Sequence, residues 1–264
     1  MTEVVLYHNA MSTCSQKVRL ALEEKALAWQ SREINLIAGE HKSKEYMLIN
    51  PRGVVPALMV DGTVILESTL INEFIEESFS GPALLPEGPA ARALARLWPK
   101  RIDEGVHSAC GVLTYGTVMR SVMLQMPREF AIAEINKVQD EGQRQVRLSL
   151  FEHGTRAPDF ESSLKLLVRF LDDLDVTLED KPWLGGNEFG LADCAAAPYV
   201  LRFDHLGLER LWASGQRPHL GAWYAALVAR PAFSKAVSDW VHPPAIQMFG
   251  LAGAEVAERL SEIG

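Results

Sequence analysis

The chain has 264 residues, of which 48% are hydrophobic and 23% are charged, as in an ordinary folded globular protein. Its formal net charge of −8 argues against nucleic-acid binding, because such binding requires a basic face. No apolar run approaches the roughly 18–20 residues that cross a bilayer. The N-terminal stretch MTEVVLYHNA also lacks the basic and apolar regions of a secretory signal. We therefore expect a cytoplasmic protein that binds neither nucleic acid nor a membrane.

The N-terminal part of the chain begins with a strand pattern followed by a helix pattern. Residues 4–7 predict a strand, residues 15–25 predict a helix with its apolar side chains close to one face, and residues 33–36 predict a second strand. Ser12 and Cys14 lie between the first two elements. Ser12 fits a helix N-cap, and Cys14 falls in the first turn, where a thiolate is stabilised. This stretch is therefore either a plain cap or the start of a site that holds a reactive sulfur.

Two further β-rich runs form a predicted hairpin, because residues 54–60 and 63–67 flank Asp61-Gly62, a strong turn signal. A helix is predicted over residues 68–79, with Ser68 as its N-cap. Strands and helices thus alternate through residues 1–80, which we predict to form one domain.

The rest of the chain is predicted to be helical. Residues 81–91 are dense in proline and glycine and are predicted to form a linker. Beyond them there is almost no strand pattern, so residues 92–264 are predicted to form an all-helical domain. The polar segment 127–158 is predicted to be a helical but loosely packed insertion in it. Long helical patterns cover residues 92–126, 161–178, 191–206 and 219–229.

Two features near the predicted hairpin suggest a binding site for a small peptide. Pro56 lies in a β-rich run, where it marks an edge, a bulge or a cis bond, unless the strand simply begins after it. If the chain turns there, the main chain of Val55 faces outward and can pair with an extended peptide. Glu67 and Ser68 follow at a strand-to-helix junction. A helix N-terminus suits a carboxylate, and a glutamate suits an ammonium group, although Ser68 taken singly is more often just a cap.

The three cysteines are Cys14, Cys110 and Cys194, and their wide spacing predicts neither a disulfide framework nor a zinc site. Free thiols are typical of a reducing cytosol. No His, Cys or carboxylate spacing indicates another metal, so we expect no metal cofactor.

Taken together, these stretches resemble the cytosolic glutathione transferases. The similarity rests on STCSQKVRLAL at the first helix, on NPRGVVPAL, DG and ES after it, and on the proline-rich linker before the helical domain. The later stretch FGLADCAAAPYV is similar to the family's capping-box helix, with Gly190 in place of the usual Ser or Thr and Asp193 as the matching carboxylate. The resemblance covers residues 3–240. It implies an α/β thioredoxin-like N-terminal domain, an all-α C-terminal domain and usually a homodimer.

Within the family, the chain is similar to two groups. Its first-helix motif looks like that of the zeta-type isomerases and the related reductive dehalogenases. The stretch NPRGVVPALMVDGTVILES and the 127–158 insertion look more like the bacterial β-aryl-etherase group, and this similarity covers more of the chain. We therefore expect a glutathione transferase, of the kind used in detoxification, that acts on a small apolar or aromatic electrophile, with ether cleavage as one form. The alternatives are a zeta-like isomerase or reductive dehalogenase, and a non-catalytic glutathione-binding protein.

The resemblance implies that glutathione is the co-substrate and reacts as its thiolate, because a thiol is a poor nucleophile. Ser12 is then expected to activate the glutathione sulfur. Cys14 is the competing candidate, since in the dehalogenase-like enzymes a cysteine near this position forms a mixed disulfide with glutathione. A buried packing role for Cys14 is the other interpretation, and we favour it slightly.

The other glutathione contacts are expected by motif match. His41 or Lys42 is expected to meet the glycyl carboxylate, and Val55, positioned by Pro56, the cysteinyl main chain. Glu67 and Ser68 are expected to bind the γ-glutamyl amine and carboxylate, and Asp103 to approach that amine across a dimer. The electrophile is expected to lie between the two domains, against a wall made by Met11, Val106, His107, Cys110, Tyr115 and Met119. His107 either polarises the substrate or is an ordinary residue of a helix surface.

Overall fold

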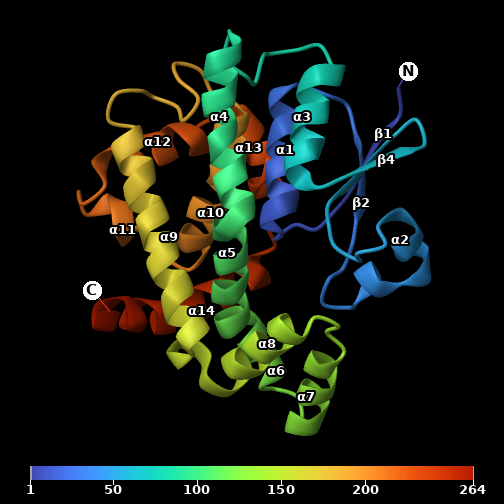
Figure 1. Cartoon of the computed structure of the whole chain (residues 1–264), viewed down its shortest axis with the longest axis vertical. Coiled ribbons are helices and arrows are strands. Elements are labelled where there is room, and N and C mark those ends of the chain that lie inside the picture. Colours follow the sequence, from blue (N-terminus) through green and yellow to red (C-terminus); the bar gives the residue numbers. More distant parts are fainter. Residues whose placement is uncertain (1, 264) are drawn as a thin grey trace.

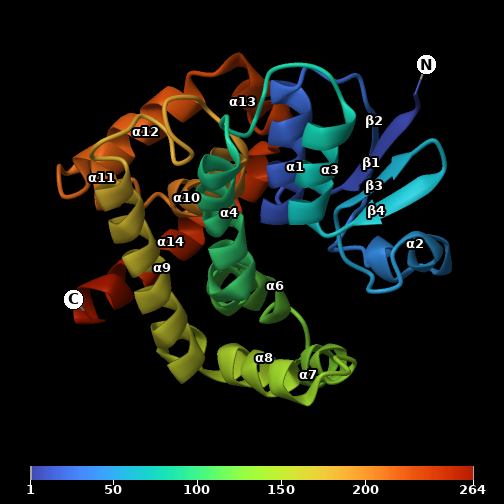
Figure 2. The ribbon, with the colours of Figure 1, turned by 45° about the horizontal axis from the view of Figure 1, so that its top comes forward.

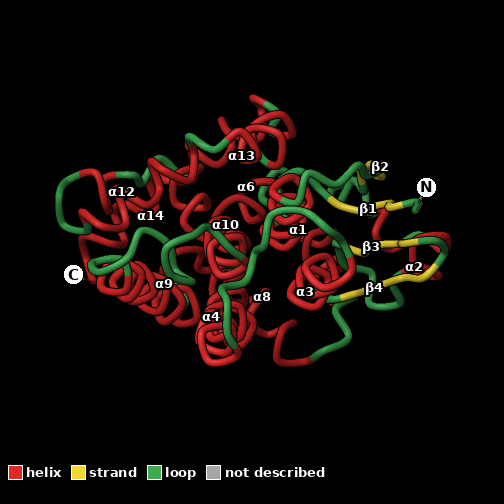
Figure 3. The backbone as a smooth tube through the Cα atoms, turned by 90° about the horizontal axis from the view of Figure 1, so that it is seen from above, coloured by secondary structure: helices red, strands yellow, loops and turns green. Residues whose placement is uncertain are grey.

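The computed structural model describes residues 2–263. Its N-terminal part contains a four-stranded sheet with three helices. In chain order these elements are β1 (Val4–His8), α1 (Thr13–Glu24), β2 (Gln30–Glu33), α2 (Lys44–Ile49), β3 (Ala57–Val60), β4 (Thr63–Leu66) and α3 (Ser68–Ser78). The strand order is β2-β1-β3-β4, with β2 parallel to β1 and the other pairs antiparallel. Figures 1 and 3 show α1 and α3 between this sheet and the helical part of the molecule.

The remaining elements are all helical. They are α4 (Pro89–Arg101), α5 (His107–Thr114), α6 (Arg120–Met123), α7 (Arg128–Asn136), α8 (Glu141–His153), α9 (Pro158–Thr177), α10 (Leu191–His205), α11 (Arg210–Ala213), α12 (Pro218–Val228), α13 (Pro231–Ala236) and α14 (Pro243–Ile263). Two π-helical turns, Ile102–Val106 and Tyr115–Met119, join α4, α5 and α6 into one long rod. Figure 2 shows the N-terminus beside the sheet and the C-terminus at the far side of the helical part. The predicted bounds of the two domains and their linker remain a prediction.

The helix α10 occupies the centre of the molecule, where it packs against both α1 and α4 (Figure 3). Its run of small residues, including the fully buried Cys194, permits this close packing. Its start is held by the fully buried Asp193, whose carboxylate accepts hydrogen bonds from the main-chain N–H groups of Leu184 and Gly190 and from the Trp223 indole. The predicted capping carboxylate is therefore present, and Trp223 does more than pack.

Gly190 departs from the family pattern for a steric reason. A Cβ atom at this position would lie 2.4 Å from the main-chain oxygen of Leu84, which accepts a hydrogen bond from the N–H of Leu191. The linker therefore passes too close to α10 for serine or threonine. Only the half of the capping box made by Asp193 can form.

The predicted hairpin is confirmed, and its turn explains the Asp-Gly pair. Asp61 and Gly62 both have positive φ, 47° and 82°, as a two-residue hairpin turn requires, and Val60 pairs with Thr63. The Val55-Pro56 peptide bond is cis, and β3 begins directly after it at Ala57.

Two predicted boundaries are wrong. The second strand is Gln30–Glu33 rather than 33–36, because this polar edge strand is positioned by its pairing with β1, from Val5 opposite Gln30 to His8 opposite Glu33. Ser68 is the first helical residue of α3 rather than its N-cap. Glu67 occupies the cap position, with a φ of 68° and without a side-chain capping bond.

The 127–158 insertion is helical, as predicted. Its two main helices, α7 and α8, lie below the rest of the helical part in Figure 1 and, with α6, enclose only a small core that is separate from the main one. The buried members of this core are Met123, Ala131, Ile135 and Phe151. Within residues 2–263, no helix is both long and apolar enough to cross a membrane.

Candidate active site

The sheet brings three predicted binding stretches to one of its ends. Tyr7 of β1 lies opposite Ala57 of β3, and Ala57 lies opposite Leu66 of β4. The chain that leaves β1 for α1, the chain that enters β3 through Val55-Pro56 and the chain that leaves β4 for α3 therefore meet at the same edge. Figure 1 shows the starts of α1 and α3 on the side of this sheet that faces the helical part.

Ser12 caps α1, as its position predicts. Its hydroxyl oxygen accepts a hydrogen bond from the main-chain N–H of Ser15 at 3.3 Å, and its main chain is extended. A hydroxyl that accepts in this way still has its own hydrogen to donate. Capping α1 and donating to a ligand sulfur are therefore compatible roles for Ser12.

Cys14, in the first turn of α1, faces His107 at the start of α5. The Cys14 Sγ atom lies 3.6 Å from Nδ1 and 3.9 Å from Nε2 of the imidazole. Cys14 is half-buried, whereas Cys110 and Cys194 are buried. Of the three thiols, Cys14 is therefore the one that has both accessible surface and an imidazole beside it, which weighs against a simple packing role.

The environment shifts the pKa values of both groups. Burial raises the pKa of the Cys14 thiol, but the hydrogen bond and charge of His107, the charge of Lys17 and the Ser68 hydroxyl outweigh it, so the net pKa lies below the ordinary thiol value. The pKa of His107 is raised, chiefly by its hydrogen bond with Cys14, against the opposing effect of burial. Shifts in these opposite directions are typical of a thiolate–imidazolium pair.

Two side chains that the sequence analysis did not assign, Tyr199 and Lys17, face this pair. The Tyr199 hydroxyl of α10 lies 3.1 Å from Nδ1 of His107. The Lys17 ammonium is fully buried one turn after Cys14, donates to the Thr69 hydroxyl at 2.8 Å and lies 3.5 Å from a carboxylate oxygen of Asp103. A lysine three positions after a cysteine shares its helix face, which is a signal in the sequence. Tyr199 carries no comparable signal.

The main chain of Val55 has no hydrogen-bond partner within residues 2–263, because the β1–β3 ladder starts at Ala57. The loop before it is held in place by the Tyr46 hydroxyl and the Asn50 amide, which both donate to the carbonyl oxygen of Val54 at 2.7 Å. Val55 thus offers an unpaired N–H and C=O group beside Pro56, on a rigid support.

Glu67 and Ser68 differ in exposure and partners. The exposed Glu67 carboxylate pairs with the guanidinium of Arg52, a residue of the NPRG stretch that the sequence analysis did not assign. Ser68 is buried, and its hydroxyl contributes to the environment of Cys14. The Ser68 hydroxyl therefore links the end of β4 to the start of α1.

His41 and Lys42 lie on the loop before α2, as predicted, in a short 3₁₀ turn (Glu40–Lys42). The Lys42 ammonium already donates to the main-chain oxygen of Gly53 at 3.2 Å. The Nδ1 atom of His41 is buried without a hydrogen-bond partner in the structure. Burial, followed by the charge of Lys42, lowers the pKa of His41. His41 is therefore a neutral imidazole with an unused polar atom.

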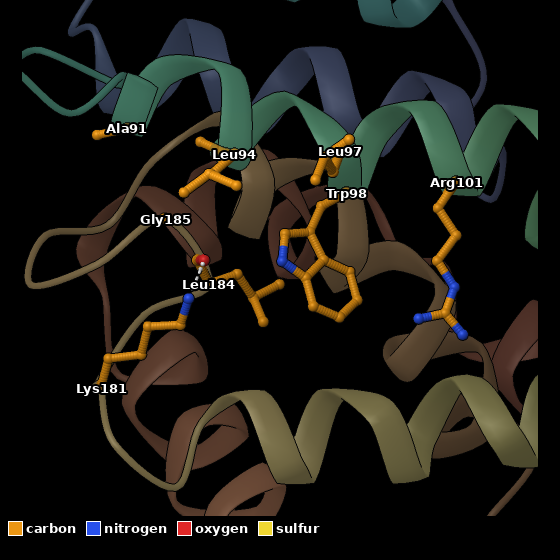
Figure 4. Close-up of a pocket in the computed structure, with 9 residues that line it drawn as sticks. Ala91, Leu94, Leu97, Trp98, Arg101, Lys181, Leu184 and Gly185 are labelled. Atoms are coloured by element: carbon orange, nitrogen blue, oxygen red, sulfur yellow. Dashed lines mark hydrogen bonds between the residues drawn. The ribbon is translucent and has the colours of Figure 1, made fainter. Parts of the chain in front are cut away.

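The predicted wall for the electrophile is only partly supported. Val106 and Cys110 are 2% and 3% exposed and pack in the main core, which weighs against a lining role. Met11 and Met119 are half-buried. Tyr115 is also half-buried, with its hydroxyl 3.2 Å from the Met123 sulfur. A separate cavity of about 370 Å³ lies between α4 and the 181–185 loop, away from all the predicted site residues (Figure 4).

The residues that line that cavity do not indicate a catalytic or binding function. Its apolar walls include Leu94, Leu97 and Trp98. Its two cations already have partners: the Arg101 guanidinium pairs with Asp173, and the Lys181 ammonium donates to the Leu184 carbonyl at 3.0 Å, the dashed line in Figure 4.

Comparison with known proteins agrees with this architecture. Residues 11–78 match the model of the glutathione S-transferase N-terminal domain, and residues 141–226 match that of the C-terminal domain. The tetrachloro-p-hydroquinone reductive dehalogenase of Sphingobium chlorophenolicum is 30% identical over 251 residues, which is 89% of this chain and 96% of that protein. The chain belongs to the glutathione S-transferase family. The predicted fold and the predicted family are therefore confirmed.

Two further relatives support the activity of this transferase. A glutathione S-transferase of Hyoscyamus muticus is 28% identical over 234 residues, covering 88% of this chain and 96% of the relative. The crystal structure of the beta-etherase LigF from Sphingobium sp. strain SYK-6 superposes with a TM-score of 0.78 at 27% identity, over 88% of this chain and 98% of that one. These relatives are enzymes, so the expectation of a glutathione transferase is confirmed over that of a non-catalytic binding protein.

Proposed function

We propose that this transferase binds glutathione where α1, β3 and α3 meet, with the glutathione sulfur at the start of α1. The observation that carries the proposal is the convergence of the Ser12 hydroxyl, the unpaired main chain of Val55 and the Glu67-Ser68 pair at one end of the sheet. An extended peptide paired with Val55 would run along this end. Its free amine would then lie near Glu67, and a carboxylate near the N-terminus of α3.

Glutathione must be ionised to react. Lowering a thiol pKa from about 8.5 by roughly two units takes about 2.7 kcal/mol. A hydrogen bond from Ser12 together with the positive end of α1 can supply an effect of this size. The thiolate then attacks a small apolar or aromatic electrophile. In ether cleavage a C–S bond forms beside a carbonyl, the C–O bond breaks, and the phenolate leaves with the electron pair.

The binding proposal is tested by calorimetric titration of glutathione into two variants. Glu67→Gln and Ser68→Ala should each weaken binding by about tenfold or more, since each removes a charge-assisted hydrogen bond of about 1.5–3 kcal/mol. Glu87→Gln, an exposed change in the linker, serves as the matched control and should bind like the wild type. Wild-type affinity in both site variants would rule out this binding mode.

The activating role is tested by turnover with chlorodinitrobenzene, a β-aryl ether and maleylacetone. Ser12→Ala should lower turnover by about tenfold to a hundredfold, which corresponds to a rise of one to two in the pKa of the bound thiol. Cys14→Ala should retain conjugation. The reverse pattern, with Ser12→Ala fully active and Cys14→Ala inactive, would transfer the central role to Cys14.

A second function, glutathione-dependent reductive dehalogenation through Cys14, is favoured by one observation. Cys14 is paired with His107 rather than packed in the core, which gives it the character of a reactive thiol. In this reaction glutathione first replaces a chloride on the ring, and the Cys14 thiolate then attacks the sulfur of that conjugate. The S–S bond of a mixed disulfide forms, the C–S bond breaks, and the ring takes the electron pair and a proton and is thereby reduced. The test is turnover of a chlorinated hydroquinone with mass analysis of the protein: Cys14→Ala should lose both turnover and the glutathione adduct.

We also propose that the transferase is a cytoplasmic homodimer. Exposed apolar side chains on α3 and α4, namely Leu70, Leu94 and Leu97, support a protein–protein contact on this side of the molecule. Light scattering should give twice the monomer mass for the wild type. Leu94→Glu combined with Leu97→Glu should shift the protein toward monomer, and an unchanged mass would locate the contact elsewhere.

A further inference from the structure

We propose that His107, held by Tyr199, takes the proton of the Cys14 thiol and keeps Cys14 as a thiolate. This inference deepens the proposed function, because it concerns a second sulfur at the same site. It assigns His107 and Tyr199 as positioning residues, whereas the sequence analysis placed His107 in the wall of the electrophile pocket.

The geometry carries the first step. Both ring nitrogens of His107 are within hydrogen-bonding reach of Sγ, at 3.6 and 3.9 Å, so proton transfer needs no large movement. The S–H bond of Cys14 breaks and an N–H bond of the imidazole forms. The electron pair of the S–H bond stays on sulfur, so this step needs no oxidant, reductant or other reactant.

Tyr199 fixes the imidazole in this position. Its hydroxyl lies 3.1 Å from Nδ1, and the two rings meet edge to face at 6.2 Å. Tyr199 is almost fully buried, and burial raises its pKa well above the ordinary value. It therefore keeps its proton and acts as a neutral partner. The hydroxyl oxygen can accept from Nδ1–H in both the neutral ring and the imidazolium, which leaves Nε2 free to take the thiol proton.

The charged and polar groups around the pair favour charge separation. Lys17 of α1 stabilises the thiolate, while Asp103, next to α5, stabilises the imidazolium. The Ser68 hydroxyl, at the start of α3, also lowers the pKa of the thiol. The titratable or polar groups that face the pair from the packed elements are Lys17, Ser68, Asp103, Cys110 and Tyr199.

The test is the pH dependence of Cys14 alkylation by iodoacetamide in the free enzyme, followed by intact mass. Cys110 and Cys194 are buried, so the reagent reports on Cys14, and Cys14→Ser should remain unmodified. The wild type should show an inflection below the ordinary thiol value of about 8.5. His107→Gln should move the inflection to higher pH. The reaction at pH 7 should slow, by about tenfold for every pH unit that the inflection rises above pH 7. Tyr199→Phe should move the inflection in the same direction but less far.

The control is His153→Gln, an exposed change at the end of α8, which should leave the profile unchanged. An unshifted inflection in a folded His107→Gln variant overturns the proposal. If that variant does not fold, the reciprocal measurement decides: Cys14→Ser should lower the pKa of His107 followed by NMR, and an unchanged His107 pKa overturns the proposal. Neither measurement uses glutathione. A negative result would therefore overturn the pairing of Cys14 with His107 without contradicting the proposed glutathione-binding site.

Discussion

At the scale of single residues, the site contains more charge than its sequence pattern suggests. Lys17 is an ammonium group with no exposed surface, on the same helix face as Cys14. A buried cation persists only where hydrogen bonds or anions compensate for its lost hydration. Its partners are Thr69 and Asp103, and a thiolate at Cys14 would be a third.

Lys17→Met should therefore alter the pair in a distinctive way. Loss of the cation removes an attraction for the thiolate and a repulsion for the imidazolium, so the pKa values of Cys14 and His107 should both rise. Alkylation profiles and NMR titration measure the two values. Thr69→Val, which removes a hydrogen bond but not the charge, is the comparison and should shift both values less. A fall in either value would contradict this description.

At the scale of elements, one carboxylate organises the start of the central helix. Asp193 is fully buried and joins α10 to the 181–186 loop and to α12 through three N–H donors. The Asp193 N–H, which a Ser or Thr side chain at position 190 would bind, donates instead to the Gly190 carbonyl oxygen at 3.0 Å. Because the donors are buried as well, the cost of losing their acceptor is expected to exceed the cost of losing any single donor.

Asp193→Ala should lower the free energy of unfolding by about 3–5 kcal/mol, since it leaves several buried donors unpaired. Trp223→Phe removes one donor while keeping most of the packing and should cost about 1–2 kcal/mol. Denaturant titration of both variants measures the difference. Equal losses would show that indole packing, rather than the carboxylate, holds the start of α10.

At the scale of the whole molecule, the sheet part and the helical part are joined by buried polar contacts. Arg19 of α1 has no exposed surface and donates to the carbonyl of Ala236 in α13. Arg202 of α10 donates to the Met11 carbonyl at 2.6 Å. Arg230, at the end of α12, makes two hydrogen bonds to the Glu24 carboxylate at 2.6 and 2.7 Å. These contacts hold α1 and the loop before it against α10 and α13.

The pair between Arg230 and Glu24 should show measurable coupling in a double-mutant cycle. Glu24→Gln and Arg230→Gln, singly and together, should give an interaction energy of about 1–3 kcal/mol in the free energy of unfolding, as expected for a bidentate and largely buried pair. Glu152→Gln with Arg128→Gln, a more exposed pair, is the matched control and should couple by less than about 1 kcal/mol. If the interaction energy of Arg230 and Glu24 is no larger than that of the control pair, then this pair does not help to join the two parts.

The sequence by itself determined the local elements and the family. Asp61-Gly62 predicts the hairpin because a two-residue hairpin turn favours positive φ at both positions, and these residues adopt it readily. Ser12 predicts the start of α1 because its hydroxyl caps an N–H group within three residues. These effects act over a few residues, so their signal is local. Asp193 was recognised through the resemblance of its stretch to the family's capping-box helix.

The tertiary structure alone decided which side chains meet. His107 and Tyr199 lie next to Cys14 because α10 packs against both α1 and α5, and no local pattern specifies these contacts. The polar β2 strand was misplaced because pairing with β1 positions it, not hydrophobic alternation. Gly190 is explained only by the passage of Leu84. Local hydrogen bonds select the elements, whereas the packing of distant helices selects the chemical environment of Cys14.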